Sequence, residues 1–502
     1  MFRKKNDYKR NAYLIYAGLM AVGIGTFIFC SITDQYTGML YALWVVWVAN
    51  MLWGCMCFRE RLLFLIFHVA YATFFMARPL IEVHRNYKWW NYLGYRFSVA
   101  DLKFALTLLL IGLCGMAIGS FLGLIGTRRK GEPFFIRFQY SREKSKPYHE
   151  EYVRCLEIVA LVLALITGAA YIYSNTYSYI WSINNGGYTA SYAGAGPYVP
   201  YFVQVASAMF KYIVIVYLVC LPSKSKAYAM LSLYVLAEIP KLLMGNRGGF
   251  VLRAIFALVY FCIRDFSQDK EKWIGKFERR VIIIAAPAGI VFLSIYNYIR
   301  DGLSLMSYNV FMIISDFFYK QGVSFCTLCL AHKVMPRLKA QRYINFSLGE
   351  VIDYWSHGTF AQRIFGATPL PSSNSVEMAT ISNNLGHRIS YLIDKYKYLN
   401  GHGYGSSYLL EGYADWGYVG ALILSIILGI VLVRMFYLLG KNRLLDVILL
   451  YMITNMFFIP RAEFTMFISF LTQIQFWLTM AVCFAGARIL LWIIKRVKIN
   501  LL

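Results

Sequence analysis

The sequence contains little charge: of its 502 residues, 15% are charged and 59% are hydrophobic. Soluble domains are typically about 25% charged and roughly 45–50% apolar, so the composition excludes an ordinary soluble enzyme. Acidic residues are especially scarce, with 25 Asp and Glu against 50 Lys and Arg, which gives a formal net charge of +25. In so apolar a chain, basic cytoplasmic loops explain this excess first, and no nucleic-acid binding is predicted.

The sequence also lacks the patterns that hold a metal, a nucleotide or a redox disulfide. Its 7 histidines are scattered without the spacing of a metal site. The glycines of GHGYGS (401–406) follow no predicted strand and form no dinucleotide signature. Cys326 and Cys329 form a CxxC without a second pair for zinc and without a βαβ context, which favours helix packing. We expect no metal and no cofactor.

The chain is instead rich in apolar runs of the length that a helix needs to cross a membrane, about 20 residues. These runs predict an all-α integral membrane protein with about 12 transmembrane helices in a single polytopic domain, residues 1–502. The first run follows Met1–Arg10 without a signal-peptide cleavage pattern, so it is expected to remain as a helix. The predicted segments are 12–32, 37–57, 62–80, 102–126, 152–173, 200–221, 226–244, 249–263, 281–298, 417–438, 445–460 and 466–492.

Lys and Arg are distributed unevenly between alternate connections. If the N-terminus is cytoplasmic, the inner segments hold most of them, notably residues 127–151 and 264–280, and the short outer connections hold few. The positive-inside rule then predicts cytoplasmic N- and C-termini. The rule leaves the few outer arginines unexplained, and they become candidates for function.

One outer connection, residues 299–416, is far longer than usual and is therefore predicted to bind substrate or to be catalytic. Its first part, residues 303–331, is apolar but interrupted by Asp316, Lys320 and Gln321. We expect short helices here that lie on the membrane or re-enter it.

The strongest local signal is AEIPKLLMGNRGGF (237–250), where Pro240 interrupts an apolar run and glycines flank Arg247. A glycine-rich break between helices presents backbone N–H groups, and a planar guanidinium donates two hydrogen bonds to phosphate oxygens. The alternative is a helix-capping turn whose arginine reaches the interface. For Arg300, the alternative to a role in the site is an interfacial ion pair with Asp301 beside a turn glycine, and for Arg461 in FFIPRAEF (457–464) it is a plain turn at Pro460.

The end of the long loop, residues 383–423, combines tyrosines with short polar side chains, as sugar recognition requires. It holds Arg388, His402, Tyr408 and Glu411. The SSYLLEGYADWG stretch (406–417) predicts a helix start capped by one of its serines, with Glu411 on the helix. Chemistry on the outer face is separated from cytoplasmic nucleotide sugars, so donors there must be lipid-linked, and isoprenoid diphosphates need interfacial cations.

The order of these features resembles that of the Wzy-type polysaccharide polymerases, the oligosaccharide repeat-unit polymerases of bacterial capsule and O-antigen pathways. The shared features are the GNRGGF turn, IRDG (299–302), FFYKQGVS (317–324), the long outer loop and GHGYGSSYLLEGYADWGYVG (401–420). The resemblance covers about residues 230–430 and implies a GT-C-like glycosyltransferase in the bacterial cytoplasmic membrane. Such an enzyme joins undecaprenyl-diphosphate-linked repeat units on the outer face and releases undecaprenyl diphosphate.

The resemblance also implies roles for individual residues. Arg247 would hold the donor diphosphate, and Glu411 or His402 would accept the proton of the acceptor hydroxyl. Further substrate-binding candidates are Arg300, Gln321, Gly322, Arg388, Tyr408 and Arg461. The implied partners are the lipid-linked oligosaccharides, membrane lipids, a flippase and a chain-length regulator.

Two other functions stay open. An O-antigen ligase, which transfers a finished chain to a different acceptor, would share the outer arginines. A flippase or transporter of lipid-linked oligosaccharides predicts charges along a central path and similarity between the halves of the chain. The notable charges here instead cluster at one face beside one long loop, which favours the polymerase.

Overall fold

The computed structural model describes residues 2–92, 94–127, 134–138, 147–185, 197–267, 271–300, 309–339, 345–371 and 373–497. Side chains are described throughout these ranges except at residues 2–9, 147–149, 286, 297–300, 310 and 339. The described chain is almost entirely helical, and its one sheet is a hairpin of the two-residue strands β1 (Asn91–Tyr92) and β2 (Tyr95–Arg96). The all-α prediction is confirmed.

Ten helices within the described ranges are long and apolar enough to span a membrane. They confirm the polytopic membrane protein, and they account for all the predicted segments except 249–263 and 445–460. The first of these forms a helix with three charged residues, Arg253, Arg264 and Asp265, and the second a helix of 14 residues, shorter than a span requires. The ten candidate spans are Arg10–Ile32, Tyr36–Met56, Phe58–His84, Val99–Leu124, Glu150–Asn184, Tyr201–Val219, Lys224–Met244, Lys276–Tyr296, Tyr408–Leu438 and Ile474–Val497.

The chain divides into two compact units. The first consists of Met1–Phe134, Val281–Tyr437 and Phe457–Thr465, and the second of Phe135–Arg280, Leu438–Met456 and Met466–Leu502. Each unit is described by itself. Whether the membrane part acts as the single domain expected from the sequence stays a prediction.

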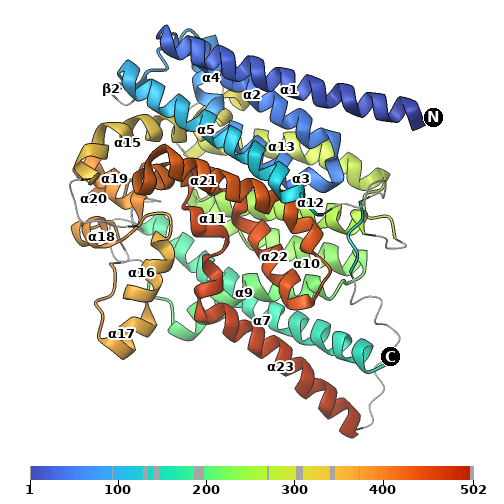
Figure 1. Ribbon diagram of the computed structural model, residues 1–502. Helices are drawn as coiled ribbons and strands as arrows, with labels where there is room; N and C mark the ends of the chain where they lie inside the picture. The colour runs from blue at the N-terminus through green and yellow to red at the C-terminus, as the bar shows by residue number, and fades with distance from the viewer. Residues whose placement is uncertain are drawn as a thin grey trace. The chain divides into compact units, whose positions relative to one another are not determined.

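The first unit holds most of the predicted outer loop. Its helices are α1 (Phe2–Ile32), α2 (Tyr36–Met56), α3 (Phe58–Tyr71), the π-helical turn η1 (Ala72–Met76), α4 (Ala77–His84), α5 (Val99–Leu124), α14 (Val310–Gln321), α15 (Val323–Lys339), α16 (Gly349–His357), α17 (Thr359–Phe365), α18 (Val376–Ile381), α19 (Leu385–Ile393), α20 (Lys395–Leu399), α21 (Tyr408–Leu438) and the 3-10 turn η3 (Ile459–Arg461). α13 (Lys276–Arg300) leads into this unit from the second. In Figure 1, α1 lies alongside α2, which also packs against α3 and α5. The apolar stretch expected at 303–331 is helical from Val310 onward.

Glycines in α5 fix the position of α21, the helix that carries Glu411. A Cβ atom added at Gly119 would lie 3.0 Å from Cα of Gly429, and one added at Gly123 would lie 3.0 Å from Cα of Ile430. The four-residue spacing places both glycines on one face of α5, where small residues let two membrane helices approach closely. The backbone of α5 thus holds α21 in place.

The second unit is built on long helices that run side by side. α7 (Pro147–Asn184) packs against α9 (Tyr201–Val219), and α23 (Ile474–Val497) packs against both. Figure 1 shows α7 and α9 in teal and α23 in dark red. The other helices of this unit are α10 (Lys224–Leu236), α11 (Ile239–Met244), α12 (Gly248–Phe266), α22 (Arg443–Met456) and the 3-10 turn η5 (Ser469–Thr472), and the turn η4 (Phe464–Phe467) leads into it from the first unit.

Candidate active site

Two predicted residues, Gln321 and Arg461, lie together in the first unit. Pro460 favours a tight turn, η3, in which the N–H of Arg461 donates to the carbonyl of Phe458 at 2.8 Å. From this turn the half-buried Arg461 places Nη1 at 3.4 Å from Oε1 of Gln321, the last residue of α14. The turn therefore brings a guanidinium to the C-terminal end of α14.

A second arginine, Arg78 of α4, lies near the same place. Its Nη2 donates to the hydroxyl of Tyr319 at 2.8 Å, and its Nε donates to Oε1 of Glu82 at 3.1 Å. Its guanidinium also lies over the ring of Tyr92, 4.8 Å from the centroid. Burial raises the pKa of Tyr92, while the positive charges of Arg78 and Arg461 act in the opposite direction. Both arginines are thus within electrostatic reach of one tyrosine.

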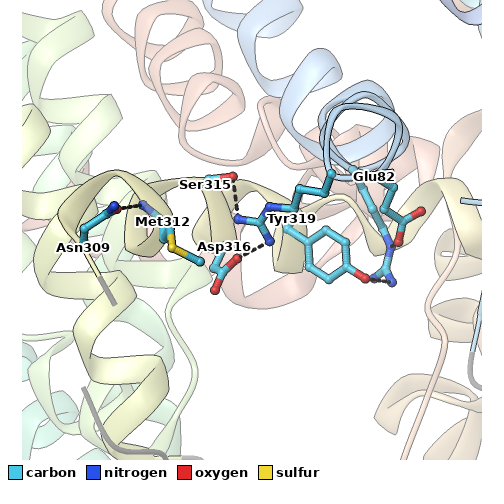
Figure 2. A network of polar contacts seen from close by, with 8 residues as sticks. Glu82, Asn309, Met312, Ser315, Asp316 and Tyr319 are labelled. Carbon is cyan, nitrogen blue, oxygen red and sulfur yellow. Dashed lines mark hydrogen bonds and ion pairs between the residues drawn. The ribbon is translucent and has the colours of Figure 1, made fainter. Parts of the chain in front are cut away.

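Arg85, the C-cap residue of α4, also contacts α14. Its Nη1 lies 2.6 Å from Oδ1 of Asp316, and its Nη2 donates to Oγ of Ser315 at 2.9 Å. Figure 2 shows Ser315, Asp316 and Tyr319 along the side of α14 that faces the helix carrying Glu82. Arg78 and Arg85, near the two ends of α4, therefore fix the position and rotation of α14.

Arg78 and Glu82 are not among the site residues predicted from the sequence. The signal was present, because the two residues are four positions apart and lie on one helical face near the end of an apolar run. The hydrogen bond from Arg78 to Tyr319 joins residues 241 positions apart, which no local pattern predicts. The start of α14, in contrast, is determined by a local interaction, because the side chain of the N-cap residue Asn309 accepts from the N–H of Met312 at 2.8 Å.

Gly322 lets the corner between α14 and α15 touch α4. A Cβ atom at Gly322 would lie 2.8 Å from the backbone N of Arg78 and 3.1 Å from its Cα, and a backbone atom cannot swing aside. We predict that Gly322→Ala destabilises the protein by about 1–3 kcal/mol, the usual cost of overpacking, and displaces Gln321. The measurement is the melting temperature in detergent.

Gly18 of α1 offers the matched control for this prediction. It has no heavy atom within 4 Å of an added Cβ, so Gly18→Ala is expected to leave stability unchanged or slightly raised. Equal melting temperatures of the two variants would contradict the close packing of the corner.

Glu411 is fully buried near the start of α21. Its Oε2 accepts from the N–H of Phe464 at 2.8 Å, and its Oε1 accepts from Oγ of Ser406 at 3.4 Å. Ser407 caps the helix, because its Oγ accepts from the N–H of Leu410 at 3.2 Å, which confirms the predicted helix start. The carboxylate thus connects the start of α21 to the segment that follows Arg461.

Glu463 is the carboxylate that lies half-buried two residues after Arg461. Its Oε1 accepts from Nδ2 of Asn384 at 2.6 Å. The Oδ1 of Asn384 in turn accepts from the N–H groups of Gly386 at 2.8 Å and His387 at 3.3 Å and so caps α19. The site therefore places a guanidinium and a partly exposed carboxylate on one short segment.

Three further predicted residues differ in their exposure. His402 is exposed, and its carbonyl accepts from Nδ2 of Asn374 at 3.2 Å. Arg388 is buried in α19 and donates to the carbonyls of Ser382 and Thr380, at the C-terminal end of α18. Tyr408 is buried at the start of α21 and accepts from Oγ of Ser425 at 3.4 Å. Their roles toward substrate stay predictions.

His387 is expected to make the stability of the first unit depend on pH. Its Nδ1 lies 3.0 Å from the hydroxyl of Tyr398, and burial lowers its pKa, an effect that Glu463 and Asp353 oppose. Between the lowered folded pKa and the ordinary value of about 6.5, the unfolded chain binds more protons than the folded chain. The free energy of unfolding is therefore expected to fall as the pH falls below about 6.5.

Melting temperatures across this pH range, for the wild type and His387→Gln, test the prediction. The substitution should flatten the wild-type decline in acid. A wild-type melting temperature that rises as the pH falls would contradict the assignment.

Arg247 lies in the second unit, on the glycine turn between α11 and α12. Gly245 ends α11 with φ of 110°, a left-handed conformation that favours glycine, and its N–H donates to the carbonyl of Leu242 at 2.9 Å. Arg247 occupies the N-cap position of α12, directly before Gly248 and Gly249, and is half-buried. The predicted break in the apolar run is thus present, and Arg247 stands where the helix dipole favours an anion.

Arg300 is the last residue of α13, and its side chain lies outside the described part of the structure. That it binds phosphate stays a prediction.

Comparison with known proteins gave one match. The family model described as O-antigen polysaccharide polymerase Wzy matches residues 13–492, nearly the whole chain. The comparison with curated proteins gave no match, and neither did the comparison with solved structures.

Proposed function

The chain belongs to the O-antigen polysaccharide polymerase Wzy family, a family of membrane glycosyltransferases, and from this premise we propose its reaction. The enzyme joins undecaprenyl-diphosphate-linked oligosaccharide repeat units, transfers the growing glycan onto the newly arrived unit, and releases undecaprenyl diphosphate. The observation that carries this proposal is the position of Arg247 on a glycine turn at the N-terminus of α12.

In the proposed step, a hydroxyl oxygen of the arriving unit attacks the anomeric carbon of the growing chain. The bond between that carbon and the diphosphate oxygen breaks, and the electron pair leaves with the diphosphate. Arg247 binds the diphosphate and stabilises the negative charge that develops on it, because a guanidinium and helix N–H groups both interact more strongly with the more negative leaving group.

The proton of the attacking hydroxyl needs an acceptor. Glu411 and His402 are the predicted candidates, and their environments separate their proposed roles. The exposed His402 is accessible to a sugar, whereas the buried Glu411 already accepts from Phe464 and Ser406. We therefore assign proton transfer to His402 and the positioning of the Arg461 segment to Glu411.

The remaining predicted residues are proposed to bind substrate. Arg461 and Gln321 lie together and suit a phosphate or a sugar hydroxyl at the end of α14. Gly322 contributes by keeping that end against α4. The other proposed substrate-binding residues are Arg300, Arg388 and Tyr408.

The proposed location is the bacterial cytoplasmic membrane, with both termini in the cytoplasm and the reaction on the outer face. The Lys- and Arg-rich connections fall on one side only if residues 249–263 and 445–460 also cross the membrane, so the proposed orientation counts both as spans in addition to the ten candidate helices. A flippase that delivers lipid-linked units and a chain-length regulator are the proposed protein partners.

Reconstitution tests the function. Purified protein in vesicles receives undecaprenyl-diphosphate-linked single repeat units, without metal ions or nucleotide sugars, and the products are separated on a gel. A ladder of lengths supports the polymerase. If folded protein leaves the single units unchanged, the proposal fails, and adding a second, different acceptor or running a flipping assay distinguishes a ligase from a transporter.

A further inference from the structure

A buried ion pair bridges the two helices that flank the Arg247 turn. Glu238 precedes α11, Arg253 lies in the second turn of α12, and Nη2 of Arg253 is 2.6 Å from Oε1 of Glu238. Their side chains are 4% and 8% exposed. We propose that Glu238 and Arg253 are positioning residues that hold Arg247 in the geometry needed to bind a lipid diphosphate. This inference rests on the proposed role of Arg247.

The pair is fixed from several sides within the second unit. The hydroxyl of Tyr171 in α7 donates to Oε1 of Glu238 at 2.5 Å, and Nζ of Lys241 donates to the Tyr171 hydroxyl at 3.0 Å. Nη1 of Arg253 donates to the carbonyl of Tyr234, near the C-terminal end of α10, at 2.7 Å. The ion pair therefore connects α7, α10, α11 and α12 around a single turn.

Gly249 shows how closely the carboxylate approaches this turn. A Cβ atom at Gly249 would lie 2.9 Å from Oε2 and 3.0 Å from Cδ of Glu238. Glu238 thus packs directly against the first turn of α12, two residues after Arg247. A displacement of this carboxylate would be transmitted to the backbone that carries Arg247.

A contribution to the stability of the fold does not explain why this ion pair is buried. Burying two charges costs several kcal/mol per ion, and apolar replacements of buried ion pairs are often neutral or stabilising. The sequence from Glu238 to Arg253 is also cationic, because it holds Lys241, Arg247 and Arg253 and one acidic residue, Glu238. A rigid turn with excess positive charge suits a multiply charged anion such as a diphosphate.

Binding of farnesyl diphosphate to the purified, full-length protein in detergent tests the inference. Arg247→Ala reports on the proposed function. Glu238→Gln and Arg253→Lys weaken the ion pair, and Gly249→Ala pushes the carboxylate away while leaving every charge in place. Melting temperatures are measured in parallel, so that each affinity is compared among variants that remain folded at the binding temperature.

The matched control is Glu278→Gln, which breaks an ion pair of the same 2.6 Å length with Lys224 in the same unit. Lys224 begins α10, roughly 20 Å along the helix from Glu238. We expect Kd to rise about tenfold or more in Glu238→Gln and Gly249→Ala, with an intermediate rise in Arg253→Lys and no change in Glu278→Gln.

The two ways of failing are distinguishable. If Arg247→Ala loses binding while Glu238→Gln and Gly249→Ala bind as tightly as the wild type, the positioning role is wrong and the proposed role of Arg247 stands. If Arg247→Ala itself binds as tightly as the wild type, its proposed role fails, and the inference fails with it.

Discussion

Arg247→Ala is expected to reduce chain extension by about 100- to 1,000-fold, the usual effect of removing one preorganised donor to a developing negative charge. Arg247 stands at the N-cap of α12 after a left-handed glycine, so its backbone is fixed before substrate arrives. The loss should appear in kcat, because the interaction strengthens as the diphosphate leaves. The measurement is the rate of polymer formation from single repeat units in vesicles.

Two other variants make this result interpretable. Arg247→Lys keeps the charge but loses the bidentate fork, so an intermediate rate is expected. Arg280→Ala removes an exposed arginine of the same unit and should leave the rate unchanged. Normal polymer from folded Arg247→Ala would remove this residue from the mechanism.

Glu411→Ala is expected to cause the second large effect, at least a 100-fold loss of chain extension together with a lower melting temperature. The substitution leaves the buried N–H of Phe464 without its acceptor, which costs about 1–3 kcal/mol. It also disconnects α21 from the segment that carries Arg461.

Glu411→Gln separates positioning from proton transfer. The amide oxygen of glutamine can still accept from Phe464, so a positioning role predicts substantial activity. Glutamine cannot accept the proton of the acceptor hydroxyl under these conditions, so a role as general base predicts that this variant is as inactive as Glu411→Ala. If the two variants are equally inactive and melt at the wild-type temperature, Glu411 acts as the general base.

The sequence predicted those parts of the fold that local physics determines. Apolar runs of sufficient length identified the spanning helices, because the bilayer core imposes both their length and their composition. The Ser407 cap and the glycine turn at Arg247 were also predictable, since both depend on residues within one or two turns.

The number of spans was less predictable. An apolar run shows that a segment is buried, but not whether lipid or protein surrounds it. α22 ends after 14 residues, and the apolar run continues at Pro460 as a 3-10 turn. A hydropathy average over a window of residues does not detect such turns.

Contacts between distant segments could not be predicted at all. Arg78 contacts Tyr319, and Glu411 accepts from Phe464. The pairing of Arg253 with Glu238 across a turn was likewise not predicted, although these two residues are close in sequence. In the sequence, Arg388 is an isolated cation and therefore a candidate phosphate ligand. In the structure, it donates to backbone carbonyls near the end of α18, and the sequence gives no sign of these partners.

In the proposed reaction, each new glycosidic bond releases one undecaprenyl diphosphate. The most direct test counts both products in the same reconstituted reaction: the bonds, from the length distribution of the polymer, and the released lipid, by mass spectrometry. We expect a ratio of one in the absence of added metal, and loss of both products in Arg247→Ala. Polymer that lengthens without release of undecaprenyl diphosphate would contradict the proposed reaction.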